Sequence, residues 1–123
     1  MSGMTVGERV LVHLWGFLRF ADAYECPVEM TQDGIASALG ISRAHAALEL
    51  KRLRDGGRVE ERMAHVANAR TRRKVYVLAP SGLETARRMR EHARERRVEL
   101  VREGERVTLS GGEAIDALRR DGV

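Results

Sequence analysis

The feature of this sequence that most constrains its fold is a single change of hydrophobic period at Arg58. Before this residue, apolar side chains recur at helical spacing, as in the i, i+4, i+7 series from Ala46 to Leu53. After it, successive residues alternate between two faces over 59–66 and over 75–78, which is the period of a strand. The sequence therefore predicts helices followed by a β-hairpin, with the residues between the two strands at its tip.

Three helices are predicted before the hairpin, each preceded by a small polar residue that caps its first turn. The first begins with a capping box, in which a threonine is followed three residues later by a glutamate. A short turn with a glycine separates the second from the third, and a glycine pair ends the third. The connection after the first helix is expected to end in a short strand over 28–30. The predicted helices cover residues 5–21, 32–39 and 42–55, with caps at Thr5, Thr31 and Ser42.

The first predicted helix carries more apolar surface than one core contact needs. On a helical wheel its apolar side chains, from Val6 to Ala21, cover a full half-turn, and Phe20 widens this stripe. A single core contact needs a stripe of only about 100°. Two explanations stay open: a second contact, such as a partner subunit, buries the surplus, or the helix is central in a small domain.

The chain after the hairpin is predicted to form a charged helix and a small appendage. A second capping box starts this helix, which is expected to end near residue 97. Residues 98–101 and 106–109 have the composition of two short paired strands, with a last helix after them. We therefore expect one domain over residues 1–97 and, over 98–123, an appendage or the start of a second domain.

The order of these elements is that of a winged helix-turn-helix. The predicted fold class is α+β, mainly α, with a three-helix core and a β-hairpin wing. A further charged helix and a short C-terminal β-hairpin and helix complete it. In this architecture the third helix, here the recognition helix 42–55, enters the major groove of DNA. The wing, residues 62–78, then lies on the adjacent backbone or in the minor groove.

The positive charge of the chain is concentrated in the predicted wing. The net charge is +4, and residues 62–83 carry five bases and no acid. Such a patch suits a polyanion such as nucleic acid. A charged face that is only solvated is the alternative explanation.

Helical geometry selects the side chains of the recognition helix that lie opposite its core stripe. Arg43 and His45 offer hydrogen-bond donors to guanine edges, whereas Leu48 and the neighbouring alanines offer only apolar contact to thymine methyl groups. This surface predicts modest base specificity, with affinity from phosphate contacts. For Leu48, burial against a partner is the alternative. The candidate DNA-binding residues are Ser42, Arg43, Ala44, His45, Ala47, Leu48, Lys51 and Arg52 on the helix, and Arg70, Arg72, Arg73 and Lys74 on the wing.

Three segments of the chain resemble MarR-type regulators: residues 31–43 in the helix-turn-helix, 50–56 at the end of the recognition helix, and 72–82 in the wing. Residues 62–78 are also similar to winged-helix modules of archaeal regulatory proteins. The resemblance covers about residues 5–97. It implies double-stranded DNA as partner, control of transcription and a homodimer, formed through the first helix with the C-terminal helix as a second candidate contact.

The sequence therefore favours a DNA-binding transcriptional regulator. The alternative is a winged-helix module that docks onto a protein within a larger regulatory assembly, which the apolar surface around Leu48 favours. Double-stranded RNA is a third, minor alternative. The operator, the direction of regulation and any small-molecule effector are left open.

Enzymatic, metal-binding and membrane functions find no support in the sequence. The four histidines fall one per predicted element without metal-ligand spacing, and no phosphate loop, nucleophile elbow or dinucleotide fingerprint is present. We therefore expect no enzymatic activity, no cofactor and no metal. No apolar run approaches the roughly 20 residues that span a bilayer. The single cysteine, Cys26, fits a reducing compartment, so a cytoplasmic location is expected.

Overall fold

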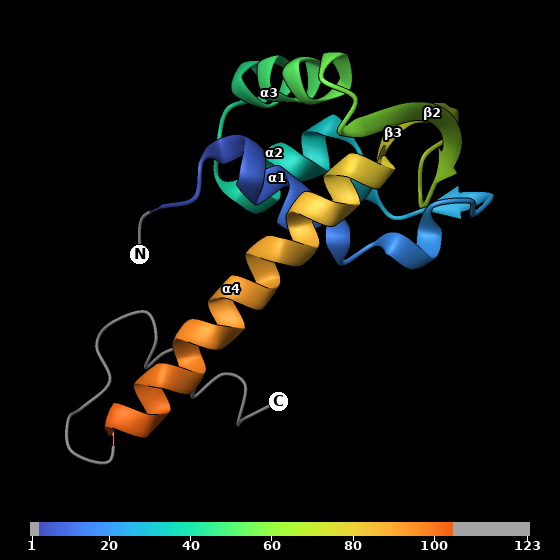
Figure 1. The fold of residues 1–123 in the computed structure, drawn as a ribbon. Coiled ribbons are helices and arrows are strands. Elements are labelled where there is room, and N and C mark those ends of the chain that lie inside the picture. The colour runs from blue at the N-terminus through green and yellow to red at the C-terminus, as the bar shows by residue number, and fades with distance from the viewer. Residues whose placement is uncertain (1–2, 105–123) are drawn as a thin grey trace. The chain divides into compact units, whose positions relative to one another are not determined.

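The computed structural model describes the backbone of residues 3–104 and the side chains of residues 3–95. Its contacts divide the chain into two compact units. One unit is Met4–Arg87, and the other consists of Arg88–Val123 together with Met1–Gly3. The predicted order of three helices, a β-hairpin and a further helix is confirmed, and with it the winged-helix fold class (Figure 1). The elements are α1 (Val6–Trp15), η1 (Leu18–Phe20), β1 (Glu25–Cys26), η2 (Val28–Met30), α2 (Gln32–Leu39), α3 (Arg43–Asp55), β2 (Val59–Val66), β3 (Arg72–Leu78) and α4 (Pro80–Gly104).

The helix-turn-helix forms because its caps satisfy the backbone groups that helix ends leave unpaired. The Thr31 hydroxyl accepts a hydrogen bond from the Gly34 backbone N–H at 3.1 Å, and the Ser42 hydroxyl accepts one from His45 at 3.0 Å. Gly40 ends α2 in the left-handed conformation, at φ 70°, which glycine adopts without steric cost. All three predicted helix caps are confirmed, including the capping box of Thr5 at α1.

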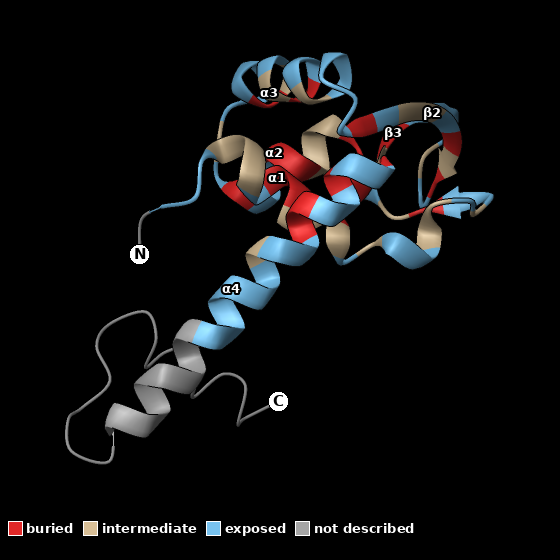
Figure 2. Ribbon diagram, in the orientation of Figure 1, coloured by how far each residue is buried: buried red, intermediate tan, exposed pale blue. Residues whose placement is uncertain are grey.

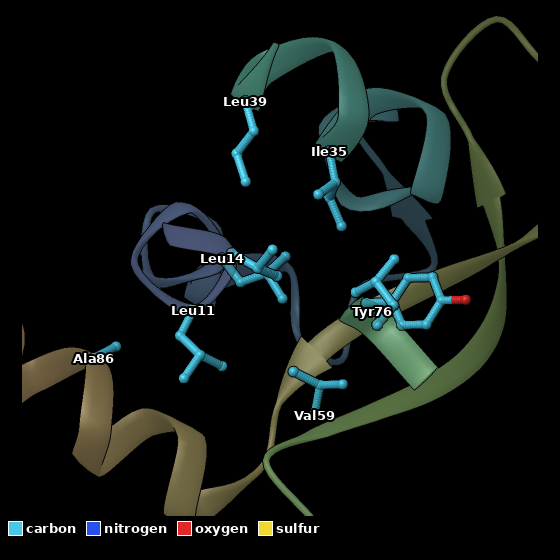
Figure 3. Packing of buried hydrophobic residues seen from close by; sticks show 9 residues of the cluster. Leu11, Leu14, Ile35, Leu39, Val59, Tyr76 and Ala86 are labelled. Atoms are coloured by element: carbon cyan, nitrogen blue, oxygen red, sulfur yellow. The ribbon is translucent and has the colours of Figure 1, made fainter. Parts of the chain in front are cut away.

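The main core is built from side chains of α1, α2, α3, α4 and the hairpin, and Figure 3 shows it from close by. Each helix contributes side chains at the spacing read from the sequence, and β2 and β3 add a valine and a tyrosine. Full burial of an aliphatic side chain stabilises the fold by about 1.5–3 kcal/mol. The buried members are Val10, Leu11, Leu14, Ile35, Leu39, Leu50, Val59, Tyr76 and Ala86.

The sheet has the order β1-β2-β3, with β1 parallel and β3 antiparallel to β2. Its register places Val59 opposite Leu78 and His65 opposite Arg72. A second buried cluster lies under this sheet, apart from the main core, and Figure 2 shows buried segments in both places. Its buried members are Cys26, Met30, Ala64, Val66 and Val75, with Phe17 and Phe20 packed against them.

The first helix is shorter than predicted, because α1 ends at Trp15 rather than near residue 21. Gly16, a poor helix former, caps it, and the chain turns into the short helix η1. This turn directs Phe17 and Phe20 into the second cluster, while α1 itself packs on the main core. Two clusters within one chain therefore take up much of the apolar surplus seen in the sequence.

The predicted strand over 28–30 is wrong, and the strand lies earlier, at Glu25–Cys26. Pro27 supplies no N–H for a strand ladder, and its carbonyl instead accepts a hydrogen bond from the Met30 N–H at 3.1 Å. That bond closes the turn of η2. The true strand depends on β2, because the Ala67 N–H donates to the Cys26 carbonyl at 3.1 Å.

The predicted strand over 98–101 is also wrong, because α4 continues as a helix to Gly104. No proline or glycine interrupts the chain between residues 83 and 103, so the established helix extends at little cost. An isolated two-stranded hairpin, in contrast, is at best marginally stable in water. The partner strand over 106–109 and the last predicted helix lie outside the described residues. The domain boundary at residue 97 stays a prediction.

Candidate nucleic-acid interface

The recognition helix α3 presents its predicted contact residues on the surface. Ala46 and Leu50 anchor one side of α3 in the core, and the opposite side is exposed (Figure 2). Leu48 is 58% exposed, so no residue that the structure describes buries it. Of the eight predicted positions, Ala47 is of intermediate burial and the other seven are exposed. The exposed positions are Ser42, Arg43, Ala44, His45, Leu48, Lys51 and Arg52.

The three predicted basic residues of α3 are each paired with an acid at the surface. The Lys51 ammonium hydrogen-bonds Asp55 and lowers the pKa of that carboxyl below its usual value. Ion pairs between exposed side chains contribute little to stability, so a phosphate can replace the exposed Asp33 and Asp55 carboxylates at small cost. The pairs are Arg43–Asp33 at 2.9 Å, Lys51–Asp55 at 2.9 Å and Arg52–Glu49 at 3.2 Å.

The wing cations are exposed and less paired than those of α3. Within the part of the chain that the structure describes, Arg70 and Arg73 form no salt bridge. The Arg72 guanidinium donates to the Met63 carbonyl at 3.0 Å, which holds it against β2. Lys74 is 3.6 Å from the Glu61 carboxylate. The four predicted wing residues therefore present positive charge at the tip and along β3.

Arg62, which was counted within the basic wing, does not belong to this surface. Its guanidinium donates to the carbonyls of Phe20, Ala21 and Ala23 at 3.0, 2.9 and 2.7 Å. It also contacts the Cys26 thiol at 3.4 Å. Arg62 therefore ties the connection after η1 to the sheet. Strand alternation is the signal that could have shown this, because it places Arg62 on the same face as the buried Ala64 and Val66.

Glu61 is the residue of the site that sequence analysis missed. Its carboxylate accepts a hydrogen bond from Arg54, in the last turn of α3, at 2.7 Å and also faces Lys74 of β3. Tyr76 lies directly across the hairpin from Glu61. Burial, the Glu61 charge and a hydrogen bond to it raise the pKa of Tyr76 to about 12. Glu61 thus links the end of α3 to both strands. Strand alternation places it on the opposite face from the exposed Glu60, but no pattern in the sequence marks it as the partner of Arg54.

We expect Glu61→Gln to lower Tm by about 4–8 °C, because it removes the charge that pairs residue 61 with both Arg54 and Lys74. Glu60→Gln removes the same charge from an exposed neighbour and is expected to leave Tm within about 2 °C of the parent. Thermal unfolding followed by circular dichroism checks both variants. Equal Tm values for the two variants would contradict a structural link at Glu61.

Neither a metal site nor a membrane-spanning helix is formed by the described residues. Among residues 3–95, no three His, Cys, Asp or Glu side chains are placed to hold a metal ion. No helix in the described chain combines the length and the apolar character that crossing a membrane requires.

Comparison with known proteins finds likeness in structure and none in sequence families. No family model matches the chain, and no curated protein matches it. MepR, a transcription regulator of the Staphylococcus aureus multidrug efflux pump MepA, is 18% identical with a TM-score of 0.62, over 96% of this chain and 73% of MepR. A MepR–DNA complex matches at 17% identity and TM-score 0.59, over 97% of this chain and 74% of that one.

A second regulator has a similar structure. ZitR of Lactococcus lactis, a zinc-responsive MarR family member, is 16% identical with a TM-score of 0.61, over 98% of this chain and 72% of ZitR. The chain therefore has the winged-helix fold of MarR-family regulators.

Proposed function

We propose that this protein is a DNA-binding transcriptional regulator that acts by binding and not by catalysis. The recognition helix 42–55 enters the major groove, and the wing contacts the adjacent backbone or minor groove. One observation carries the proposal: the exposed face of α3 and the basic wing are joined by Arg54 and Glu61 at 2.7 Å. A MepR–DNA complex has the same fold, which supports this arrangement.

The proposed roles follow from side-chain chemistry. Arg43 and His45 donate to base edges, while Leu48 and the alanines of α3 contact thymine methyl groups. Ser42 caps α3, and its exposed position at the helix N-terminus suits a phosphate. The remaining cations contact phosphates, and these are Lys51 and Arg52 on α3 and Arg70, Arg72, Arg73 and Lys74 on the wing.

We further propose a cytoplasmic homodimer with its DNA-binding domain over residues 1–97. The proposed contacts are α1 and the C-terminal helix, on the strength of the likeness to MarR-type regulators. The apolar surface near α1 is a weaker argument for a dimer contact than the sequence indicated, because Phe17 and Phe20 pack within the chain. The similarity of residues 62–78 to archaeal modules stays a prediction.

Docking onto a protein is the second candidate function. It is favoured by Leu48, a large apolar side chain that is 58% exposed beside small alanines on α3. Interface centres are enriched in apolar groups and depleted of charge. The ion-paired cations around Leu48 favour DNA instead.

Binding to a fluorescently labelled 30-base-pair duplex of random sequence tests the function directly. We expect a Kd in the micromolar range or tighter at about 50 mM salt, weakening steeply towards about 200 mM. If the six proposed phosphate-contacting cations all engage, log K falls against log salt with a slope of about −5 per bound protomer. Fluorescence anisotropy provides the measurement. Absence of binding at the lowest salt would refute the DNA-binding function and direct attention to a protein partner of the Leu48 surface.

A further inference from the structure

Tyr24 is an exposed aromatic residue that is nevertheless held in place. It is 77% exposed, more than any other large apolar side chain that the structure describes. Its ring lies on the His65 imidazole, with centroids 4.6 Å apart and planes tilted by 32°. The backbone N–H of His65 also donates a hydrogen bond to the backbone carbonyl of Tyr24 at 3.3 Å. The two rings therefore form a preorganised pair on the protein surface.

Three wing residues share a face of the sheet with this pair. Met63 lies two positions before His65 on β2, so their side chains point to the same side, and Met63 is 47% exposed. Across the hairpin, Lys74 is opposite Met63 and Arg72 is opposite His65. Paired residues of neighbouring strands also point to one side. We call the surface made by Tyr24, Met63, His65, Arg72 and Lys74 the outer wing face.

The outer wing face continues the surface of the recognition helix. Glu61 lies two positions before Met63 on β2, on the same side, and accepts a hydrogen bond from Arg54 of α3. The face therefore begins where α3 ends. At the edge formed by β1, the exposed acid Glu25 lies opposite His65 in the parallel strand pair. The positive part of the face therefore lies between two acids, Glu25 and Glu61, and next to the proposed groove-binding helix.

We propose that Tyr24 and Met63 of the outer wing face pack against deoxyribose sugars of the DNA backbone that the wing cations contact, beside the groove that α3 enters. This inference rests on the proposed DNA-binding function. A duplex backbone presents anionic phosphates and apolar deoxyribose faces in turn, and tyrosine and arginine side chains are among the groups that contact it. Arg72 and Lys74 meet the phosphates, while Tyr24 and Met63 cover the sugars. The stacked pair is already ordered, so little side-chain freedom is lost on binding.

The composition of the outer wing face favours nucleic acid over protein. Two of its five members, Arg72 and Lys74, are exposed cations. Lysine is depleted in protein–protein interfaces, whereas protein–DNA interfaces are strongly positive. Aromatic residues with a polar tip suit a surface that is apolar on one side and wet on the other.

The test compares Tyr24→Ala with the unaltered full-length chain, using the random 30-base-pair duplex across about 50–200 mM salt. Removing an uncharged contact releases no counterions. We therefore expect affinity to fall about three- to tenfold at every salt concentration, with an unchanged salt slope. Tyr24→Phe keeps the ring and is expected to bind within about twofold of the parent. Met63→Ala, a second change on the same face, is expected to weaken binding in the same manner.

Val28→Ala is the matched control, because Val28 is 48% exposed and lies on η2, outside the outer wing face. If the parent binds and Tyr24→Ala behaves like Val28→Ala, the inference fails while the DNA-binding function stands. If the parent does not bind, the function itself fails. Equal losses of affinity in Tyr24→Phe and Tyr24→Ala would contradict packing of the Tyr24 ring against the DNA backbone, because Tyr24→Phe keeps the ring. A change in sedimentation with unaltered affinity would assign the face to a protein contact and overturn the proposal.

Discussion

The triple variant Arg70→Ala/Arg72→Ala/Arg73→Ala is expected to bind any duplex about a hundredfold more weakly than the parent at 0.1 M salt. These side chains are exposed, and within the described chain neither Arg70 nor Arg73 is tied up in a salt bridge. Each lost phosphate contact removes about 0.9 from the log–log salt slope, so the slope should fall from about −5 to about −3. The loss should be equal for all sequences, because phosphates carry no base information. Anisotropy titrations at several salt concentrations measure both quantities.

The matched control replaces the same three residues with lysine. Lysine keeps the positive charge and loses the planar fork of donors, so the salt slope should stay near that of the parent. Unchanged affinity in the alanine variant would remove the wing from the interface. A loss confined to certain sequences would mean that the wing contacts bases.

Gly34→Ala is expected to lower the free energy of unfolding by about 3 kcal/mol, the largest stability effect we predict for a single methyl group. A Cβ at residue 34 would lie 2.0 Å from the Val28 carbonyl oxygen and 2.8 Å from the Glu29 Cα. Both are backbone atoms, so α2 and η2 would have to separate. The separation would also strain the Thr31 hydroxyl, which donates to Val28 at 2.7 Å and caps α2. Urea denaturation followed by Trp15 fluorescence measures the change.

Gly16→Ala is the control for this substitution. Gly16 has a φ of −68°, and the nearest atom to its added Cβ, the His13 carbonyl oxygen, is 3.4 Å away. Alanine fits there without displacement, so we expect a change of less than about 1 kcal/mol. A Gly34→Ala variant as stable as Gly16→Ala would show that α2 and η2 do not approach each other this closely.

The elements that were predicted correctly are those whose signals lie close together in the sequence. Thr31 and Ser42 each cap a helix through a bond to a backbone N–H three residues away. The register of the hairpin follows from alternation along adjacent segments. The exposed face of α3 follows from helical spacing, since Ala46 and Leu50 determine which side is buried.

The errors concern segments whose structure depends on distant partners. The strand at Glu25–Cys26 exists because β2 pairs with it, forty residues further along the chain in the register. A strand of two residues is too short to show an alternating pattern of apolar and polar side chains in the sequence. The first helix was extended over Phe17 and Phe20 because the second cluster, into which they turn, cannot be seen in the local pattern.

The roles of charged residues divide in the same way. Helical geometry placed the bases of α3 at the surface, because that depends only on the period of the helix. Helical geometry does not apply to β2, where Glu61 binds Arg54 and Glu60 is exposed. The count of basic residues in the wing did not show that Arg62 bonds to three distant carbonyls, whereas the other wing cations face solvent.

Local chemistry along the chain was thus enough to specify the helix-turn-helix, the hairpin and the sign of the wing's charge, since caps, periods and charges act within a few residues. The tertiary structure decided where each apolar surplus is buried, which strand completes the sheet, and which charged side chains hold the fold together instead of facing a ligand. The physical reason is that burial and ion pairing are properties of residues brought together by folding. Their partners lie up to 42 residues apart, and no local pattern in the sequence identifies them.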